Sequence, residues 1–454
     1  MDFSIFRAYD IRGVYPTQIS EGTAYRIARN IKRVFGTARA IVIGRDGRLS
    51  SPALHEGLVE GLRVAGIKVI DVGVTTWPSM AFFVPRMNSQ GGIMITASHN
   101  PSEFNGFKGI DKSGIPLGGG QMLKKIGRRF LERDIDPFRI AHSKNALREL
   151  ADKKAYARFI ASFSSLRRPL KIVFDASNGT TSVFLHDIFL SIENINPIFI
   201  NTTIDGSFPA HGPDPTRAHS RDMLSLAVRE SGADFGVVFD GDGDRAVFVD
   251  ERGDDIKPEH IWRLLLNNGA QTSVVTVVDA YDAHILASTM EQEGMSAGHI
   301  YESKVGHLFM TRGMRAHGAD VGFEYSGHYY FKEFGGVGSG LLAAIKVANA
   351  VSLLPYSLSR FVSFLPRVHE MDEISIRFSR PYFSKLVQTI KKAFAPLGAS
   401  FSSADGLSVQ LDGAWCNVRT SNTQDLLRIN IKAESERALR DFAKKFAHST
   451  HLPI

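Results

Sequence analysis

The sequence predicts an α/β protein in which three similar mixed α/β domains and a smaller α+β C-terminal domain surround a central cleft. Three observations support this fold class. Apolar strand-like runs alternate with amphipathic stretches over most of the 454 residues, a pattern typical of doubly wound α/β layers. A glycine, an apolar run and a polar loop recur three times, about one small domain apart. The last part of the chain changes to strands that are grouped together.

The alternation of strands and helices is clearest in three pairs of segments. Apolar runs that end in polar turns predict buried parallel strands at 38–48, 170–180 and 272–281. Amphipathic stretches predict the helices that follow them at 51–66, 182–192 and 283–294.

The repeated strand and loop reads "GGIMITASHNP" at 91–101, "ADFGVVFDGDGDR" at 233–245 and "ADVGFEYSGHYY" at 319–330. Ligands of open α/β sheets bind at the carboxyl ends of the strands. We therefore expect each loop to contribute side chains to one shared cleft.

The C-terminal part predicts a strand at 367–378, a helix at 381–398, strands at 406–421 and 426–435, and a closing helix at 435–449. These shifts of pattern predict four domains, with boundaries at 1–150, 151–252, 253–366 and 367–454.

Composition narrows the class of protein. No run of about 18 apolar residues occurs, and the N-terminus lacks an apolar signal core, so we expect no membrane partner. The single cysteine, Cys416, excludes an intrachain disulfide framework and suits the cytoplasm. The net charge of +7 fits anionic small substrates such as phosphates, or a basic surface without a partner. No dense Lys/Arg run or aromatic RNA-binding motif is present, so we expect no nucleic-acid partner.

"DGDGDR" places Asp240, Asp242 and Asp244 two residues apart. Alternate residues of an extended turn point the same way, and Gly241 and Gly243 allow the turn to be tight. Three carboxylates suit a hard cation such as Mg²⁺. A solvated acidic turn and a calcium loop are the alternatives, although the residues after the motif predict a strand rather than the helix of an EF-hand.

Three other loops carry polar groups of use in catalysis or binding. "TASHNP" offers Ser98 as a nucleophile that needs activation, and Lys108 follows in "NGFKG" as a base or phosphate ligand. "FEYSGHYY" offers groups suited to sugar hydroxyls, and "VRTSNT" offers a phosphate cradle. Ordinary turn chemistry is the alternative for each loop, and an exposed, solvated lysine is the alternative for Lys108. In "FEYSGHYY" these residues are Glu324, Ser326 and His328. In "VRTSNT" they are Arg419, Ser421, Asn422 and Thr423.

Taken in order, these motifs resemble the α-D-phosphohexomutases, in particular the phosphomannomutase/phosphoglucomutase branch. The resemblance covers nearly the whole chain and rests on "FRAYDIRG", "GRDGRLSS", "TASHNP", "NGFKG", "DGSFPAHGPDP", "DGDGDR", "KVGH", "FEYSGH" and "RTSNT". "TASHNP" followed by "DGDGDR" is the most specific combination. Two stretches depart from the family pattern: "FGGVGSGLLAA" has no acidic residue, and "VVDAYDAHIL" has no lysine.

The resemblance implies that Ser98 carries the phosphoryl group as a phosphoserine. It implies that Mg²⁺ is held by Ser98, Asp240, Asp242 and Asp244. The implied catalytic residues are Ser98, Lys108, His307, Arg245 and Arg12, with Lys108 and His307 as the candidate general acid and base. The implied substrate-binding residues are Tyr9, Glu324, Ser326, His328, Arg419, Ser421, Asn422 and Thr423.

Such a protein is an isomerase of carbohydrate metabolism. It converts hexose 1-phosphate and 6-phosphate of mannose, glucose or both into each other, through a hexose 1,6-bisphosphate. The alternatives are a phosphoglucosamine mutase, a metal-dependent sugar phosphatase and a sugar-phosphate binding protein without turnover. "FRAYDIRG" favours the hexose branch, and a hydrolase needs no second phosphate cradle. We expect hexose phosphates as partners and a cytoplasmic protein. The sequence carries no signal for the oligomeric state, for which we favour a monomer.

Overall fold

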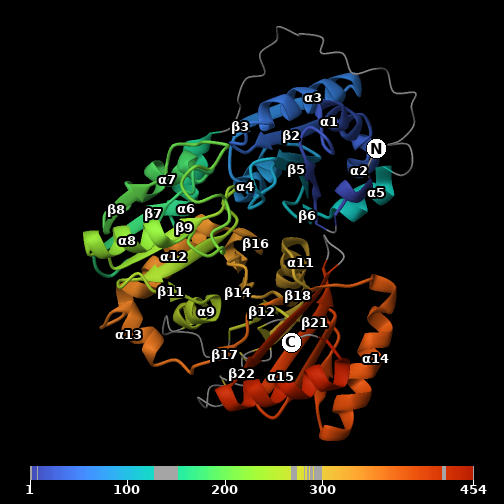
Figure 1. Cartoon of the computed structure of the whole chain (residues 1–454). Helices are drawn as coiled ribbons and strands as arrows, with labels where there is room; N and C mark the ends of the chain where they lie inside the picture. The colour runs from blue at the N-terminus through green and yellow to red at the C-terminus, as the bar shows by residue number, and fades with distance from the viewer. Residues whose placement is uncertain are drawn as a thin grey trace.

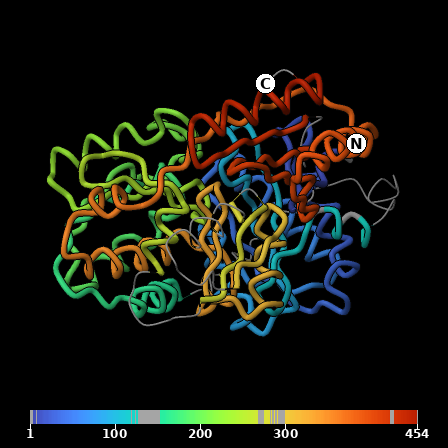
Figure 2. The backbone as a smooth tube through the Cα atoms, turned by 90° about the horizontal axis from the view of Figure 1, so that it is seen from below, coloured from blue at the N-terminus to red at the C-terminus, as the bar shows by residue number. Residues whose placement is uncertain are grey.

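The structure, a computed structural model, describes residues 3–7, 9–126, 152–266, 274–280, 282–283, 286, 290, 299–421 and 426–452. Figure 1 shows four bodies in chain order: blue, green, yellow to orange, and red. Figure 2, turned by 90°, shows the green body at the left and the red segment along the upper edge. Within the described ranges, no helix is both long enough and apolar enough to cross a membrane.

The first domain is built on a six-stranded sheet with the order β1-β5-β4-β2-β3, to which β6 adds by pairing with β5. Its strands are β1 (Ile11–Val14), β2 (Ala40–Arg45), β3 (Lys68–Val74), β4 (Gly91–Ile95), β5 (Phe104–Asp111) and β6 (Pro116–Leu117). Its helices are α1 (Glu21–Arg29), α2 (Ile31–Phe35), α3 (Ser51–Val64), α4 (Trp77–Arg86) and α5 (Gly119–Ile126). Helix α3 agrees with the helix expected at 51–66, because it buries Leu54, Leu58 and Leu62 at four-residue spacing.

The second domain has a five-stranded sheet with the order β11-β10-β9-β7-β8. Its strands are β7 (Leu170–Asp175), β8 (Ile195–Ile200), β9 (Phe235–Phe239), β10 (Ala246–Asp250) and β11 (Asp255–Ile256). Its helices are α6 (Lys153–Ala161), α7 (Ser182–Phe189) and α8 (Asp222–Ser231). Every residue of β9 is buried, as expected of a strand covered on both faces.

The third domain has a sheet with the order β13-β12-β14-β15-β16. Its described strands are β12 (Thr276–Asp279), β13 (Ile300–Ser303), β14 (Val321–Phe323), β15 (Tyr329–Phe331) and β16 (Val337–Gly338). The helices around it are α9 (Pro258–Leu266), α11 (His307–His317), α12 (Gly340–Leu353) and α13 (Leu358–Ser363). Most of the helix expected at 283–294 lies outside the described residues.

These three sheets share one topology. Three parallel strands are followed by an antiparallel fourth, in the orders β3-β2-β4-β5, β8-β7-β9-β10 and β13-β12-β14-β15. The three loops of the sequence repeat therefore occupy one equivalent place, between the third and fourth strands. The expectation of three similar mixed α/β domains is confirmed.

The C-terminal domain is an antiparallel sheet with the order β17-β22-β21-β20-β19, and β18 also pairs with β22. Its strands are β17 (His369–Glu370), β18 (Ile374–Arg377), β19 (Ser400–Ser402), β20 (Leu407–Leu411), β21 (Ala414–Thr420) and β22 (Leu426–Ala433). Its helices are α14 (Phe383–Phe394) and α15 (Glu436–Thr450), which are orange and red, respectively, in Figure 1. The single strand expected at 367–378 is wrong. Acidic residues, which are poor strand formers, interrupt it at Asp372 and Glu373.

The apolar core is distributed unevenly among the domains. One cluster contains side chains of the first three domains, among them Trp77, Phe174 and Phe323. A separate cluster belongs to the C-terminal domain and contains Ile390, Val409 and Phe446. Among its described residues, Trp415 is the one buried apolar side chain that joins the shared cluster. The first three domains are therefore packed into one unit, and the C-terminal domain is largely self-contained.

Candidate active site

A cleft of about 780 Å³ is lined by residues of all four domains. The expected central cleft is therefore present. The predicted site residues that line it are Tyr9, Arg12, Ser98, Lys108, Asp244, Arg245, His307, Glu324, Ser326, His328, Arg419 and Ser421. Asp240 and Asp242 are completely buried beside it. Asn422 and Thr423 lie outside the described residues.

Ser98 lies in the loop that follows β4, in a conformation that serine rarely adopts. Its φ of 50° is in the left-handed region, which costs a non-glycine residue about 1–3 kcal/mol. The backbone N–H of Ser98 donates to Thr96 Oγ1 over 2.9 Å, and its Oγ donates to Asp240 Oδ2 over 2.7 Å. The loop thus directs the hydroxyl toward the carboxylates of the second domain.

Arg48 supports this loop from inside the protein, a role that sequence reasoning missed. Its guanidinium donates to the carbonyl oxygens of Ser98 (2.7 Å), Asn100 (2.6 Å), Pro101 (2.6 Å) and Phe104 (2.9 Å). Its Nε also donates to Asp46, and Arg48 is 1% exposed. One planar cation therefore satisfies four carbonyls of the loop that carries the nucleophile. Only the spacing of "GRDGR" before a helix could have drawn attention to it.

Asp240, Asp242 and Asp244 converge in the loop between β9 and β10. Each offers a carboxylate oxygen, and these oxygens lie within 4.8 Å of one another. Lys108 Nζ donates to Asp242 Oδ2 and Asp244 Oδ2 over 2.8 Å each. Asp242 Oδ1 is buried and accepts no hydrogen bond from the described residues. Three buried carboxylates with an unused oxygen suit a divalent cation with oxygen ligands.

Electrostatics within the triad agree with that interpretation. Burial and the neighbouring carboxylates raise the pKa of Asp240 and Asp242. Burial acts on Asp244 as well, but Lys108 and His328 hold its pKa well below the usual range. Burial alone would lower the pKa of Lys108, yet the carboxylates outweigh it and hold the pKa above normal. The site thus concentrates negative charge that further positive charge would stabilise.

His307 begins helix α11 and faces the first domain across the cleft. Its ring centroid lies 6.1 Å from that of Tyr9 and 5.9 Å from that of Trp77. Burial and the nearby Lys108 lower the pKa of His307 to about 3. Its Nε2 is buried without a hydrogen-bond partner among the described residues. A neutral imidazole with a free nitrogen can accept or return a proton. Gly306 precedes it with φ 122°, and a Cβ there would lie 2.5 Å from the Tyr9 ring.

The loop between β14 and β15 holds the third group of polar residues. Glu324 Oε1 accepts from the Gly306 backbone N–H over 2.6 Å, and its Oε2 accepts from Tyr330 OH over 2.5 Å. Ser326 Oγ lies 2.8 Å from His328 Nδ1, and His328 Nε2 lies 3.2 Å from Asp244 Oδ1. This loop therefore touches the carboxylate triad at one side and opens to the cleft at the other.

The C-terminal domain contributes cationic and amide side chains at the far side of the cleft. Arg419 is the last residue but one of strand β21, and Ser421 follows the end of the strand. Arg428 and Asn430, which sequence reasoning missed, line the cleft from β22. The alternation in "LLRINIKA" could have found them, because Leu427, Ile429 and Ile431 are the core-facing residues of this strand.

Four family models match successive parts of the chain. They are described as phosphoglucomutase/phosphomannomutase alpha/beta/alpha domain I (residues 4–135), domain II (154–253), domain III (264–368) and the C-terminal domain (373–449). The chain belongs to the phosphoglucomutase/phosphomannomutase family.

Relatives within the phosphoglucomutase/phosphomannomutase family match over nearly their full length. A phosphomannomutase of Salmonella typhimurium is 31% identical, with 95% of each chain covered. A phosphoglucomutase of Neisseria gonorrhoeae is 32% identical, covering 97% of this chain and 95% of the relative. A crystal structure of a phosphoglucomutase/phosphomannomutase family protein from Burkholderia thailandensis has a TM-score of 0.85 at 27% identity, covering 99% of this chain and 97% of the other.

Proposed function

We propose that the protein catalyses the reversible conversion of hexose 1-phosphate and hexose 6-phosphate, with Ser98 as the phosphoryl carrier. Family membership and relatives named phosphomannomutase and phosphoglucomutase support a mutase of the isomerase class. The observation that carries the role of Ser98 is its 2.7 Å hydrogen bond to Asp240, at the edge of the carboxylate triad. A nucleophile on a cleft lined by Arg12, Arg245 and Arg419 suits anionic phosphate esters.

The residues that would hold Mg²⁺ are Asp240, Asp242 and Asp244, with an oxygen on Ser98 as a further ligand. Their convergence and the unused oxygen of Asp242 support this assignment. When bound, the ion neutralises charge that develops on the group in transfer. Arg245, whose backbone N–H donates to Asp240 Oδ1 over 3.2 Å, adds a guanidinium beside it.

Residues of the chain can transfer the phosphoryl group and account for both protons that move with it. The bond between phosphorus and Ser98 Oγ breaks, and a bond from phosphorus to the free hydroxyl oxygen of the sugar forms. His307 takes the proton of that hydroxyl, and Lys108 supplies the proton that Ser98 Oγ gains. The resulting hexose 1,6-bisphosphate turns end for end and returns its other phosphate to Ser98, with the two proton transfers reversed. Positioning and electrostatics account for most of the catalysis in such transfers.

Reorientation of the bisphosphate explains why four domains share one cleft. While one phosphate lies at Ser98, the other needs a second anion site, for which we assign Arg419 and Ser421, together with Asn422 and Thr423. Glu324, Ser326 and His328 hold sugar hydroxyls between the two ends, and Tyr9 and Arg12 close the side formed by the first domain. The sugar presents some of its hydroxyl groups in both orientations, and these can be bound without a contact to the hydroxyl on carbon 2. We therefore propose that mannose and glucose phosphates are both substrates.

Parallel assays of mannose 1-phosphate and glucose 1-phosphate test the proposal. Mg²⁺ and a trace of the matching 1,6-bisphosphate are present, and 6-phosphate and free phosphate are both followed. Conversion of both sugars is the expected result, and conversion of one alone would contradict dual specificity. Free phosphate without isomer would show a phosphatase. Faster conversion of glucosamine 1-phosphate than of either hexose would show a phosphoglucosamine mutase.

We assign phosphoserine, metal-binding, sugar-binding and distal-phosphate roles to residues 1–150, 151–252, 253–366 and 367–454, respectively. We also propose a cytoplasmic monomer, which light scattering of the purified protein checks for mass.

A further inference from the structure

A buried ion pair joins the third domain to the C-terminal domain behind the cleft. Lys432 Nζ, on β22, donates to Asp282 Oδ1 over 2.7 Å. Lys432 is 1% exposed and Asp282 is 0% exposed. Glu370 Oε2 lies 3.6 Å from the same ammonium group. Since the partners of Lys432 belong to both domains, this arrangement exists only when the C-terminal domain is docked.

The ammonium group of Lys432 also supports the sugar-binding loop. It lies 4.9 Å from the centroid of the Tyr325 ring, a cation–π distance. Tyr325 lines the cleft between Glu324 and Ser326, and its backbone N–H donates to Asp279 Oδ2 over 3.1 Å. Arg428 and Asn430 line the cleft from the same face of β22, whereas Lys432 is not among the cleft-lining residues. Lys432 therefore contacts the loop from behind and does not contact the sugar.

The ammonium group of Lys432 offsets the negative charge of buried carboxylates around it. Burial raises the pKa of Asp282 to about 6, even though Lys432 acts to lower it. Glu259 is 5% exposed, and Lys432 holds its pKa down against the effect of burial. Neither carboxylate oxygen of Glu259 has a hydrogen-bond partner among the described residues. The stretch "VVDAYDAHIL" has no lysine, so a lysine from another domain neutralises Asp282. Lys257 of the third domain pairs with Glu370 over 2.6 Å.

We propose that Lys432 is a positioning residue that couples docking of the C-terminal domain to the sugar-binding loop. Docking brings its ammonium group against Asp282 and the ring of Tyr325, which fixes the loop that carries Glu324 and Ser326. The same domain carries Arg419 and Ser421, so capture of the distal phosphate at one end of the substrate orders the hydroxyl contacts in its middle. The inference rests on the proposed function, because it assigns hexose phosphate to this cleft.

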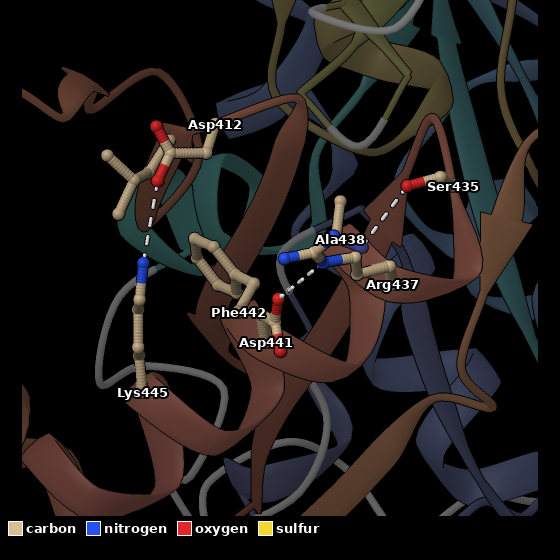
Figure 3. A pocket seen from close by; sticks show the side chains of 8 residues that line it. Asp412, Ser435, Arg437, Ala438, Asp441, Phe442 and Lys445 are labelled. Carbon is tan, nitrogen blue, oxygen red and sulfur yellow. Dashed lines mark hydrogen bonds and ion pairs between the residues drawn. The ribbon is translucent and has the colours of Figure 1, made fainter.

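Substrate binding without turnover gives the first test. In a Ser98→Ala background, calorimetry measures the affinity for glucose 1-phosphate with and without Lys432→Met. We expect binding at least tenfold weaker in the double variant. Lys445→Met is the matched control, because Lys445 pairs with Asp412 over 3.4 Å on the surface of the same domain. Figure 3 shows this pair at a shallow hollow of about 240 Å³ beside α15, outside the cleft. The control should change affinity less than twofold.

A charge-neutral pair separates positioning from stability. Lys432→Met alone leaves buried carboxylates unpaired and should lower the unfolding temperature, whereas Asp282→Asn/Lys432→Met should restore part of it, because Asp282 is then neutral while Glu259 still lacks the ammonium group. We expect the restored protein still to bind glucose 1-phosphate at least fivefold more weakly than its parent, and its KM in the Ser98 enzyme to rise more than its kcat falls. Affinity that recovers together with the unfolding temperature would overturn the proposal, because Lys432 would then act only on stability.

The same experiments distinguish failure of the proposed mutase reaction from failure of the proposed role of Lys432. A wild-type protein that binds glucose 1-phosphate but isomerises neither it nor mannose 1-phosphate would refute the mutase reaction, while the binding series would still decide the role of Lys432. Absence of hexose-phosphate binding by Ser98→Ala would refute both.

Discussion

Replacement of Arg48 by methionine tests how the protein holds its nucleophile. Methionine is also long and unbranched but donates no hydrogen bonds, so the carbonyls of Ser98, Asn100, Pro101 and Phe104 lose their common partner. Asp46, which is 1% exposed, loses its cation as well. A hydrogen bond to a charged group contributes about 1.5–3 kcal/mol, and breaking a buried ion pair costs about 3–5 kcal/mol.

These contributions are not additive, because all the contacts share one side chain. We therefore expect a loss of about 3–5 kcal/mol, a large part of the 5–15 kcal/mol typical of total stability. Ser98 should then leave its left-handed conformation, which is itself unfavourable. Displacement of a reacting group by about 1 Å reduces the rate about 100-fold. The substrate-binding arginines of the other domains are unchanged, so KM should change less than about threefold.

The assay couples hexose 6-phosphate formation to a dehydrogenase, with circular dichroism to confirm the fold and its unfolding temperature. Arg63→Met is the control, since Arg63 is an exposed arginine on α3 that pairs with Glu60. Arg48→Lys keeps the charge beside Asp46 but not the planar fork, so it should preserve stability better than kcat. A folded Arg48→Met protein with wild-type kcat would refute the positioning role.

Three further predictions concern the metal ligands, the histidine and the lone thiol. Asp242→Asn keeps the size of the side chain but removes a buried charge, so calorimetry should show Mg²⁺ affinity reduced at least about tenfold; unchanged affinity would place the ion elsewhere. His307, with its pKa lowered to about 3, should stay neutral from pH 5 to 8, so the one ring signal that disappears in His307→Asn should not titrate there. The unfolded chain binds that proton below its ordinary pKa of about 6.5, so this residue's contribution to stability is complete above pH 6.5 and falls between pH 6.5 and 3. Cys416 is 0% exposed and burial raises its pKa, so a thiol reagent should react only as the C-terminal domain unfolds; fast reaction with the folded protein would contradict its burial.

The repeated motifs were predictable from sequence because their physics is local. An apolar strand that ends in a polar loop has the same meaning wherever it occurs, so Ser98, Asp240 and Glu324 could be assigned to equivalent loops. The close spacing of the three aspartates likewise predicted convergence without knowledge of the fold.

Residues that act through distant partners were not predictable in this way. Arg48 is 50 positions from Ser98, and its acceptors are carbonyl oxygens, which carry no sequence signal. Lys432 is 150 positions from Asp282, and either residue alone resembles an ordinary surface charge. The two strands at 369–377 were expected as one, because apolar alternation does not show where a partner strand stops pairing.

The separate core of the C-terminal domain bears on how such a protein can change between lineages. Recombination near the junction that precedes β17 would exchange a unit with its own apolar interior, and the contacts at risk are those of Trp415 with the shared apolar cluster and of Lys432 with Asp282. Recombination within the first three domains would divide a common interior and combine halves that do not match. The phosphate-holding end can thus come from another lineage as one unit only where the recipient's third domain supplies a carboxylate at position 282 for Lys432, while Ser98 and the aspartates around it are unchanged.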